Sequence, residues 1–386
     1  MDARSGRNAV KRIMLTQPNI RYLTDIFFDF GAVSVLNSLL KKYDIKRPLV
    51  ITDKGLVEIG MISALKIIDP VIYDGVETNP TEAMATEAAE FYNKNNCDGI
   101  IAYGGGSPID LAKCAAILVH HKSPLENYSV SSGGGSKITN TLPPIIAIPT
   151  TAGSGSEVGR AALITIKEGR KIGIISEHLI PRASICDPEL TVSMPPILTA
   201  ATGMDALSHC VECFCSPKFN PVADAISLDG MERGLKNIIP ATREGKLQAR
   251  AEMMMCSLEG GMSFQKGLGA VHSLSHPLGG LTSKKLHHGT LNAIFLPHVL
   301  KFNTNYCMDK MKSIADKLDL RDVSQIVTAF EKLIGHLGLP SSLRELGITK
   351  EDLEPLSEKA MNDHCTATNP RPMVIDDFVN LYAEAW

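Results

Sequence analysis

The sequence predicts a two-domain protein, with an α/β domain built on a mainly parallel sheet over residues 1–192 and an all-helical domain over residues 193–386. Its 386 residues are too many for one ordinary hydrophobic core. In the first half, short apolar runs that end in turn residues alternate with segments of helical periodicity, which is the pattern of a parallel sheet. From about Pro195 those runs give way to long segments rich in Ala, Leu, Met and Glu.

Three apolar runs predict buried strands of the first domain. They open the segments PLVITDKG (48–55), CDGIIAYGGG (97–106) and PPIIAIPTTAGSGSE (143–157), and each ends in a loop of small or polar residues. Helices are predicted over the intervening segments at 80–96, with Thr81 as the N-cap, and at 107–121. Strand, loop and helix therefore alternate as they do in an open α/β sheet.

The second half predicts consecutive helices that are interrupted by proline. Proline lacks a backbone N–H and its ring clashes with the preceding turn, so helix breaks are expected at Pro221, Pro240, Pro277 and Pro340.

Composition excludes several function classes. The formal net charge is −3 and no basic block exceeds Lys-Lys, which argues against a nucleic-acid partner. No apolar run approaches the roughly 20 residues that span a bilayer, so no membrane segment is expected. Nine cysteines without regular disulfide spacing favour reduced thiols and a cytoplasmic protein. The basic first dozen residues are interpreted as a loose arm rather than a transit peptide.

Two loops at predicted strand ends are candidates for binding a phosphorylated ligand. GGGSPID (104–110) opens a helix, whose N-terminal amides suit an anion, and PTTAGSGSE (149–157) adds hydroxyl groups. In open α/β sheets such loops line the ligand crevice. The first loop does not match the G-x-G-x-x-G fingerprint, and a glycine turn before a helix is often a plain connection. Asp53, after another strand, suits the ribose hydroxyls of an adenosine or simply starts a turn.

Polar pairs in the helical half predict a metal site. Asp205 and His209 are four residues apart and therefore share a helix face, as do His272 and His276. A carboxylate with imidazoles suits iron(II) or zinc, although one such pair alone is more often a surface contact. Cys210, Cys213 and Cys215 lie beside His209 but lack a second cysteine pair, so buried thiols are a better interpretation than a zinc site.

Together these motifs resemble the iron-containing alcohol dehydrogenases over nearly the whole chain. TDKG, NPT, GGGSPID, PTTAGSGSE, ATGMDALSH, HSLSHPLGG and HHG occur in the order typical of that family. The resemblance implies an N-terminal dinucleotide-binding domain, a helical metal-binding and catalytic domain, and a site in the cleft between them. This is the fold shared with dehydroquinate synthases. It also implies NAD and a divalent metal as cofactors, with iron(II) expected and zinc as the alternative.

The resemblance also implies roles for individual residues. The implied cofactor-binding residues are Asp53, Asn79, Gly105, Gly106, Ser107, Asp110, Thr150, Thr151, Ser154 and Lys171. The implied metal ligands are Asp205, His209, His272 and His288. The loop before HHG is longer than in common members, and histidine replaces the usual proline, so spacing leaves His287 and His288 as alternatives. His288 is preferred because it directly precedes Gly289 and the following helix.

The long loop, with DFGAVSVL, LHHGTLNA and DHCTATNP, resembles the 4-hydroxybutyrate dehydrogenase branch. The implied reaction is the NAD-dependent interconversion of 4-hydroxybutyrate and succinate semialdehyde. Alternatives are other short-chain alcohols or diols and, more remotely, a dehydroquinate synthase-like lyase. A carboxylate substrate requires a cationic anchor, and the candidates are Lys266, Lys284, Lys285 and Arg371.

His276, one helical turn beyond His272, is the candidate for relaying the alcohol proton, with helix packing as the alternative role. A small-molecule alcohol or aldehyde is the expected partner, and a homodimer or higher homo-oligomer is the expected assembly.

Overall fold

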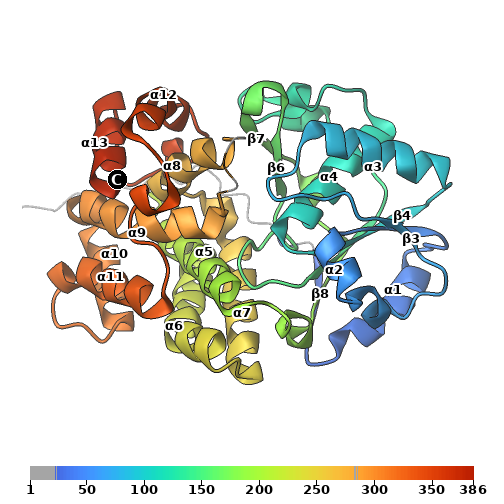
Figure 1. Ribbon diagram of the computed structural model, residues 1–386, viewed down its shortest axis with the longest axis horizontal. Helices are drawn as coiled ribbons and strands as arrows, with labels where there is room; N and C mark the ends of the chain where they lie inside the picture. Colours follow the sequence, from blue (N-terminus) through green and yellow to red (C-terminus); the bar gives the residue numbers. More distant parts are fainter. Residues whose placement is uncertain (1–21, 23, 282–283, 285) are drawn as a thin grey trace, which may run out of the picture.

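The computed structural model describes residues 22, 24–281, 284 and 286–386, which form a sheet-based half followed by a helical half (Figure 1). In the first half, six parallel strands form one sheet in the order β1-β8-β5-β4-β2-β3, and β6 and β7 form an antiparallel pair. This confirms the predicted mainly parallel sheet. The strands are β1 (Asp25–Phe28), β2 (Pro48–Ile51), β3 (Val71–Tyr73), β4 (Gly99–Gly104), β5 (Ile145–Pro149), β6 (Ala161–Thr165), β7 (Lys171–Ile175) and β8 (Ala183–Cys186).

Helices cover both faces of this sheet. Along β2, Leu49 and Ile51 pack into a cluster with α3 and α4, whereas Val50 faces the opposite cluster, which contains α1. Because successive strand residues point to opposite faces, a continuous apolar run is required here. The helices of this half are α1 (Leu36–Lys42), α2 (Lys54–Glu58), α3 (Glu82–Lys94) and α4 (Gly106–His120).

The cap predicted for the first long helix is confirmed. Thr81 has an extended backbone, and its side chain accepts a hydrogen bond from Met84 N at 3.3 Å. The chain therefore turns into α3 at the residue that satisfies one of the free amides of the first turn.

The β6–β7 hairpin was not among the predicted strands. It is fixed against α4, because the Leu163 amide donates to Asp110 Oδ2 at 3.1 Å and Lys113 Nζ donates to Ala161 O at 2.8 Å. The hairpin therefore covers α4 on the side toward the helical half (Figure 1).

The helical half is built around α5, which is buried from Thr199 to Cys215. In Figure 1, α6, α7 and α9 surround it. The helices are α5 (Pro196–Cys215), α6 (Pro221–Arg243), α7 (Leu247–Ser263), α8 (Ala270–Gly279), α9 (His288–Asn303), α10 (Met308–Lys317), α11 (Ile326–Leu337), α12 (Lys350–Met361) and α13 (Ile375–Ala385). Within the described residues, no helix has the length and apolar character needed to cross a membrane.

Two of the four predicted helix breaks are wrong. Pro221 opens α6 and Pro340 lies between α11 and α12, as expected. Pro240 and Pro277, however, lie inside α6 and α8. Both occupy the last turn of a helix, so the lost hydrogen bond and the ring clash affect only the end of an already packed helix.

Candidate active site

The two phosphate-loop candidates lie side by side at the carboxyl ends of β4 and β5. The Thr150 amide donates to Gly104 O at 3.0 Å, and a Cβ on Gly106 would lie 2.8 Å from Ser154 Cβ. Only glycine at 106 permits this approach. Gly106, Ser107, Thr151 and Ser154 line a common cavity of about 340 Å³. The first-turn amides of the 15-residue helix α4 therefore face a space able to hold an anion.

Asp110 lines the same cavity, but both of its carboxylate oxygens accept hydrogen bonds from other residues of the chain. Oδ1 accepts from Ser156 Oγ at 2.6 Å, and Oδ2 accepts from the Leu163 amide. Burial raises the pKa of Asp110, against the effect of nearby Lys113. Asp110 therefore positions the hydroxyl loop and the β6–β7 hairpin around the cavity.

Asp53, Gly105 and Thr150 lie at the same sheet edge but do not line this cavity. Asp53 is the N-cap of α2, and its Oδ1 accepts from the Leu56 amide at 3.0 Å. A capping carboxylate held in this way is fixed in orientation at the end of β2, the strand next to β4.

Asn79 and Lys171 connect the cofactor side of the cavity to the histidines. Lys171 Nζ donates to Asn79 Oδ1 at 3.1 Å, and Asn79 Nδ2 donates to Leu286 O at 3.5 Å. Burial lowers the pKa of Lys171, while Asp110, Asp205 and Asp363 oppose this.

The helical half brings together one carboxylate and three imidazoles. Asp205 and His209 come from one face of α5, His272 comes from α8, and His288 is the first residue of α9. One donor atom from each lies within 4.8 Å of all the others. Asp205 Oδ1 is 3.6 Å from His209 Nε2, 3.8 Å from His272 Nε2 and 3.7 Å from His288 Nε2. The four side chains therefore form a convergent set of the kind that holds a divalent cation.

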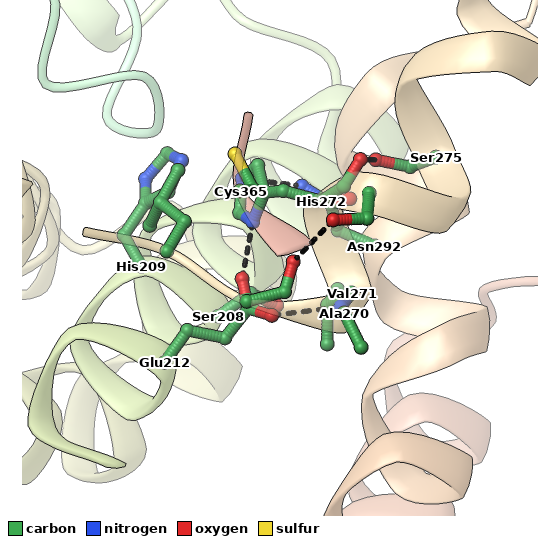
Figure 2. A network of polar contacts seen from close by, with 12 residues as sticks. Ser208, His209, Glu212, Ala270, Val271, His272, Ser275, Asn292 and Cys365 are labelled. Carbon is green, nitrogen blue, oxygen red and sulfur yellow. Dashed lines mark hydrogen bonds and ion pairs between the residues drawn. The ribbon is translucent and has the colours of Figure 1, made fainter. Parts of the chain in front are cut away.

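The far nitrogens of two rings are already engaged, which directs their Nε2 atoms inward. His209 Nδ1 lies 3.1 Å from Gly153 O, and His272 Nδ1 bonds to Glu212 Oε2. Glu212 also accepts from the Val271 amide at 2.7 Å, as Figure 2 shows. Such partners fix the tautomer and orientation of metal-binding histidines.

Several acceptor atoms converge on the side-chain amide of Asn292 on α9. Its Nδ2 lies 2.6 Å from Asp205 Oδ1 and 3.1 Å from Nε2 of both His272 and His288. Two amide hydrogens do not satisfy three acceptors, and Asn292 Oδ1 is buried without a hydrogen bond. A buried excess of acceptor atoms fits a cation.

The protonation states also fit a metal. Burial lowers the pKa of His272 and of His288 well below the ordinary value, and neighbouring histidines add to the effect. Both rings are therefore neutral at neutral pH, as ligands must be. Burial raises the pKa of Glu212 to about 8, and the hydrogen bond from the Val271 amide opposes this rise. The donor set suits iron(II) and zinc alike.

His287 lies outside the group formed by Asp205 and the three histidines. It is the residue before α9, and it lines the cavity without joining the four-donor group. Its Nδ1 is buried without a hydrogen bond, and burial lowers its pKa. Of the two adjacent histidines, the structure brings His288 to Asp205.

His276 adjoins the four-donor group. Its Nδ1 lies 2.9 Å from Asp363 Oδ2, and its ring stacks on those of His288 and His364 at 5.5 and 5.8 Å. Its Nε2 is buried, lacks a hydrogen bond, and belongs to a residue that lines the cavity. Asp363 therefore orients an imidazole that retains one available nitrogen.

Glu212, Asn292 and Asp363 were missed by sequence reasoning. Glu212 lies three residues after His209, and Asn292 lies four after His288, so both share a helical face with a histidine. That spacing was the available signal. Asp363 lies 87 residues from His276, and no spacing rule connects them.

Of the residues considered as carboxylate anchors, those that the structure describes do not line the cavity. Lys266 is buried, donates to Phe214 O at 2.8 Å and pairs with Asp224. Its charge is thus already balanced within the helical core.

Arg371 and Lys284 likewise have other partners. Arg371 lies 3.2 Å from Asp377 and stacks on the Phe302 ring, and Lys284 lies 3.4 Å from Asp352. Lys285 falls outside the described residues.

The interpretation of the cysteines as thiols is confirmed. All nine are free, and Cys210, Cys213 and Cys215 are buried. Burial raises the pKa of Cys213, as expected for a thiol that packs as a small apolar side chain.

Comparison with known proteins identifies the family. A model of the iron-containing alcohol dehydrogenases matches residues 24–188, and a model of the C-terminal part of the Fe-containing alcohol dehydrogenase family matches residues 199–386. The chain is 47% identical over 371 residues to 4-hydroxybutyrate dehydrogenase of Cupriavidus necator, covering 93% of this chain and 97% of that protein. It is 36% identical over 379 residues to 1,3-propanediol dehydrogenase of Citrobacter freundii, covering 93% and 96%.

Solved structures agree with the sequence relatives. A 1,3-propanediol oxidoreductase superposes with a TM-score of 0.89 at 34% identity, over 95% of this chain and 100% of that one. A sulfoacetaldehyde reductase from Bifidobacterium kashiwanohense in complex with NAD⁺ gives 0.84 at 27% identity, over 95% and 98%. The chain therefore belongs to the iron-containing alcohol dehydrogenase family.

Proposed function

We propose that this enzyme oxidises 4-hydroxybutyrate to succinate semialdehyde, and catalyses the reverse reaction, with NAD and a divalent cation. One observation carries the proposal: the loops that suit a dinucleotide phosphate and the Asp205–His288 group line the same cavity. The substrate assignment is supported by the 47% identity to a 4-hydroxybutyrate dehydrogenase. In the forward direction, the alcohol and NAD⁺ give the aldehyde, NADH and one proton.

The chain would hold the cofactors from both halves. Gly105, Gly106, Ser107, Thr150, Thr151 and Ser154 would hold the pyrophosphate and nicotinamide, with Asp53 at the ribose and Asn79, Asp110 and Lys171 positioning the nicotinamide end. Asp205, His209, His272 and His288 would hold the cation, for which we propose iron(II). When bound, the cation supplies Lewis acidity toward the alcohol oxygen, and NAD⁺ supplies the hydride acceptor.

His276 would take up the alcohol proton. His276 lines the cavity, its Nε2 has no hydrogen bond and its Nδ1 is held by Asp363, so the ring has one nitrogen available and a fixed orientation. The ring of His364, which lines the same cavity, stacks on that of His276. The proton would then pass to solvent.

The enzyme is further proposed to be a cytoplasmic homo-oligomer with a domain boundary at 192/193. Free, mostly buried thiols fit a reducing compartment. Ile26 on edge strand β1 and Phe30 just after it are partly exposed, which fits a contact between copies. Light scattering on the purified protein measures the assembly.

A substrate panel tests the function. Protein reconstituted separately with iron and zinc is assayed with NAD⁺ and 4-hydroxybutyrate, 1,3-propanediol or 1-butanol, and 4-hydroxybutyrate should give the highest kcat/KM. A higher value for the diol would reassign the substrate, and no NADH with any alcohol would contradict an alcohol dehydrogenase.

The ligand assignment is tested with adjacent histidines as a matched pair. Replacing His288 with Ala should abolish bound metal, whereas replacing His287 with Ala should largely preserve it. Metal content is measured by atomic absorption, and the reverse outcome would exchange their roles.

A further inference from the structure

Three basic side chains line the active-site cavity among the described residues: Arg160, Lys171 and Lys218. Lys171 bonds to Asn79 and lies within the field of Asp205, at the metal end. Arg160 lies where the cavity meets a neighbouring hollow. Lys218, in the short loop between α5 and α6, is exposed, and no carboxylate in the described part of the chain pairs with it. Lys218 is therefore available to an anionic ligand.

Lys218 and His364 both line this cavity. Burial lowers the pKa of His364, Asp363 opposes this, and the charge of the Lys218 ammonium group lowers it further. The ring of His364 stacks on His276, which in turn stacks on His288. Lys218 therefore lines the same cavity as this row of rings, which begins at the metal site, and its charge acts on the last ring of the row.

The wall along this row suits a short aliphatic chain. Phe264, Leu268 and Ala367 line the same cavity and offer apolar contact. The carboxylates that line it, Asp110 and Asp205, belong to the cofactor and metal ends and are already hydrogen-bonded. Asp363 contacts His276 and His364 but does not line the cavity. On the cavity wall itself, a substrate anion at the end near Lys218 and His364 therefore meets the positive charge of Lys218.

The length of 4-hydroxybutyrate matches this arrangement. Standard bond lengths put its carboxylate carbon about 5 Å from its hydroxyl oxygen in the extended form. Neighbouring rings in the row from His288 to His276 are 5.5 Å apart. A hydroxyl group at the metal site therefore leaves the carboxylate beside His276 and His364, where the flexible stem of Lys218 can bring its ammonium group to it.

We propose that Lys218 binds the carboxylate of a four-carbon ω-hydroxy acid and thereby selects it over an uncharged alcohol. This inference rests on the proposed function. It assigns substrate discrimination to a loop between α5 and α6, away from the lysines and arginine that the motifs suggested.

The test compares Lys218→Gln with Lys332→Gln, which removes the same charge from an exposed position on α11. KM and kcat are measured for 4-hydroxybutyrate, for 1-butanol as the uncharged analogue of equal length, and for NAD⁺. Lys218→Gln should raise KM for 4-hydroxybutyrate about tenfold or more, because a charge-assisted hydrogen bond is lost. The values for 1-butanol and NAD⁺ should stay unchanged, Lys218→Arg should retain most of the affinity, and Lys332→Gln should behave as wild type.

Each contrary outcome has a distinct meaning. An unchanged KM for 4-hydroxybutyrate in Lys218→Gln overturns the inference while leaving the proposed function intact. An equal rise for 1-butanol shows a structural effect, and a rise for NAD⁺ alone shows a cofactor contact; either overturns it. Wild-type turnover of 1-butanol without turnover of 4-hydroxybutyrate contradicts the proposed substrate itself. Circular dichroism and metal content confirm that the variants are folded and loaded.

Discussion

Replacing Glu212 with Gln tests whether the metal site depends on a residue that does not touch the metal. Glu212 is 5% exposed and accepts hydrogen bonds from the Val271 amide and from His272 Nδ1. His272 must keep its proton on Nδ1 if Nε2 is to offer a lone pair to the cation. Gln has nearly the same shape, so the change alters hydrogen bonding with little effect on packing.

The expected magnitude follows from counting donors and acceptors. A glutamine has one acceptor oxygen, whereas Val271 N and His272 Nδ1 are both donors that point at the two oxygens of Glu212. In either amide orientation one buried donor faces another, unless His272 moves its proton to Nε2 and loses its metal-binding lone pair. An unsatisfied buried donor costs about 1–3 kcal/mol. Metal affinity should therefore fall about 10- to 100-fold.

A competition titration against a chelator of known affinity measures this change, with zinc as the probe metal. Glu259→Gln is the matched control, because Glu259 is a largely buried carboxylate on α7 that lies 3.7 Å from Arg233. An affinity within twofold of wild type in Glu212→Gln would refute the argument. A comparable loss in Glu259→Gln would show that the effect is not local to the site.

Three further changes have defined outcomes. Asp53→Gly should relax the preference for NAD over NADP, measured as the ratio of kcat/KM values, and an unchanged ratio would remove Asp53 from the ribose site. Burial raises the pKa of Glu157 from 4.5 to about 7, so the folded state holds this proton more tightly than the unfolded chain and stability falls as pH rises through that window, by about 3 kcal/mol. Urea denaturation at pH 5 and pH 8 should show a smaller fall in Glu157→Gln than in wild type, with the remaining fall due to other buried carboxyl groups such as Glu212. Gly261→Ala should destabilise the protein by about 1–3 kcal/mol in thermal unfolding, because its Cβ would lie 2.3 Å from Gly155 O, whereas Gly335→Ala, with open space around the Cβ, should not.

Much of the fold could be predicted because it follows from local patterns. Continuous apolar runs predicted β2, β4 and β5, which are three of the four inner strands of the sheet and are buried on both faces, whereas the fourth inner strand, β8, was not predicted. The short edge strands β1 and β3 are only partly buried and carry a weak pattern. The β6–β7 hairpin owes its place to Asp110 and Lys113 on α4, which no periodicity reveals.

The candidate site likewise has some features that the sequence predicts and others that it does not. Helical spacing could place Asp205 and His209 on one face, and the family resemblance selected His288 over its neighbour. The residues that orient these side chains are distant from them in the sequence: Gly153 lies 56 residues from His209, and Glu212 lies 60 residues from His272. Lys218 was missed because an isolated lysine in a loop has no sequence pattern. Its role depends on how α5 and the segment after α12 pack together.

The four-donor group also links parts of the chain that are far apart, since Asp205 and His288 come from different helices and enclose more than eighty residues between them. An unfolded chain has no such site, so occupancy favours the folded state by mass action. A free metal concentration a thousand times the dissociation constant adds about 4 kcal/mol, which is a large part of the stability of an ordinary domain. The cellular supply of the bound metal would then affect the lifetime of this protein against proteolysis as well as its turnover rate. Starvation for the ion should lower its abundance before any change in its synthesis.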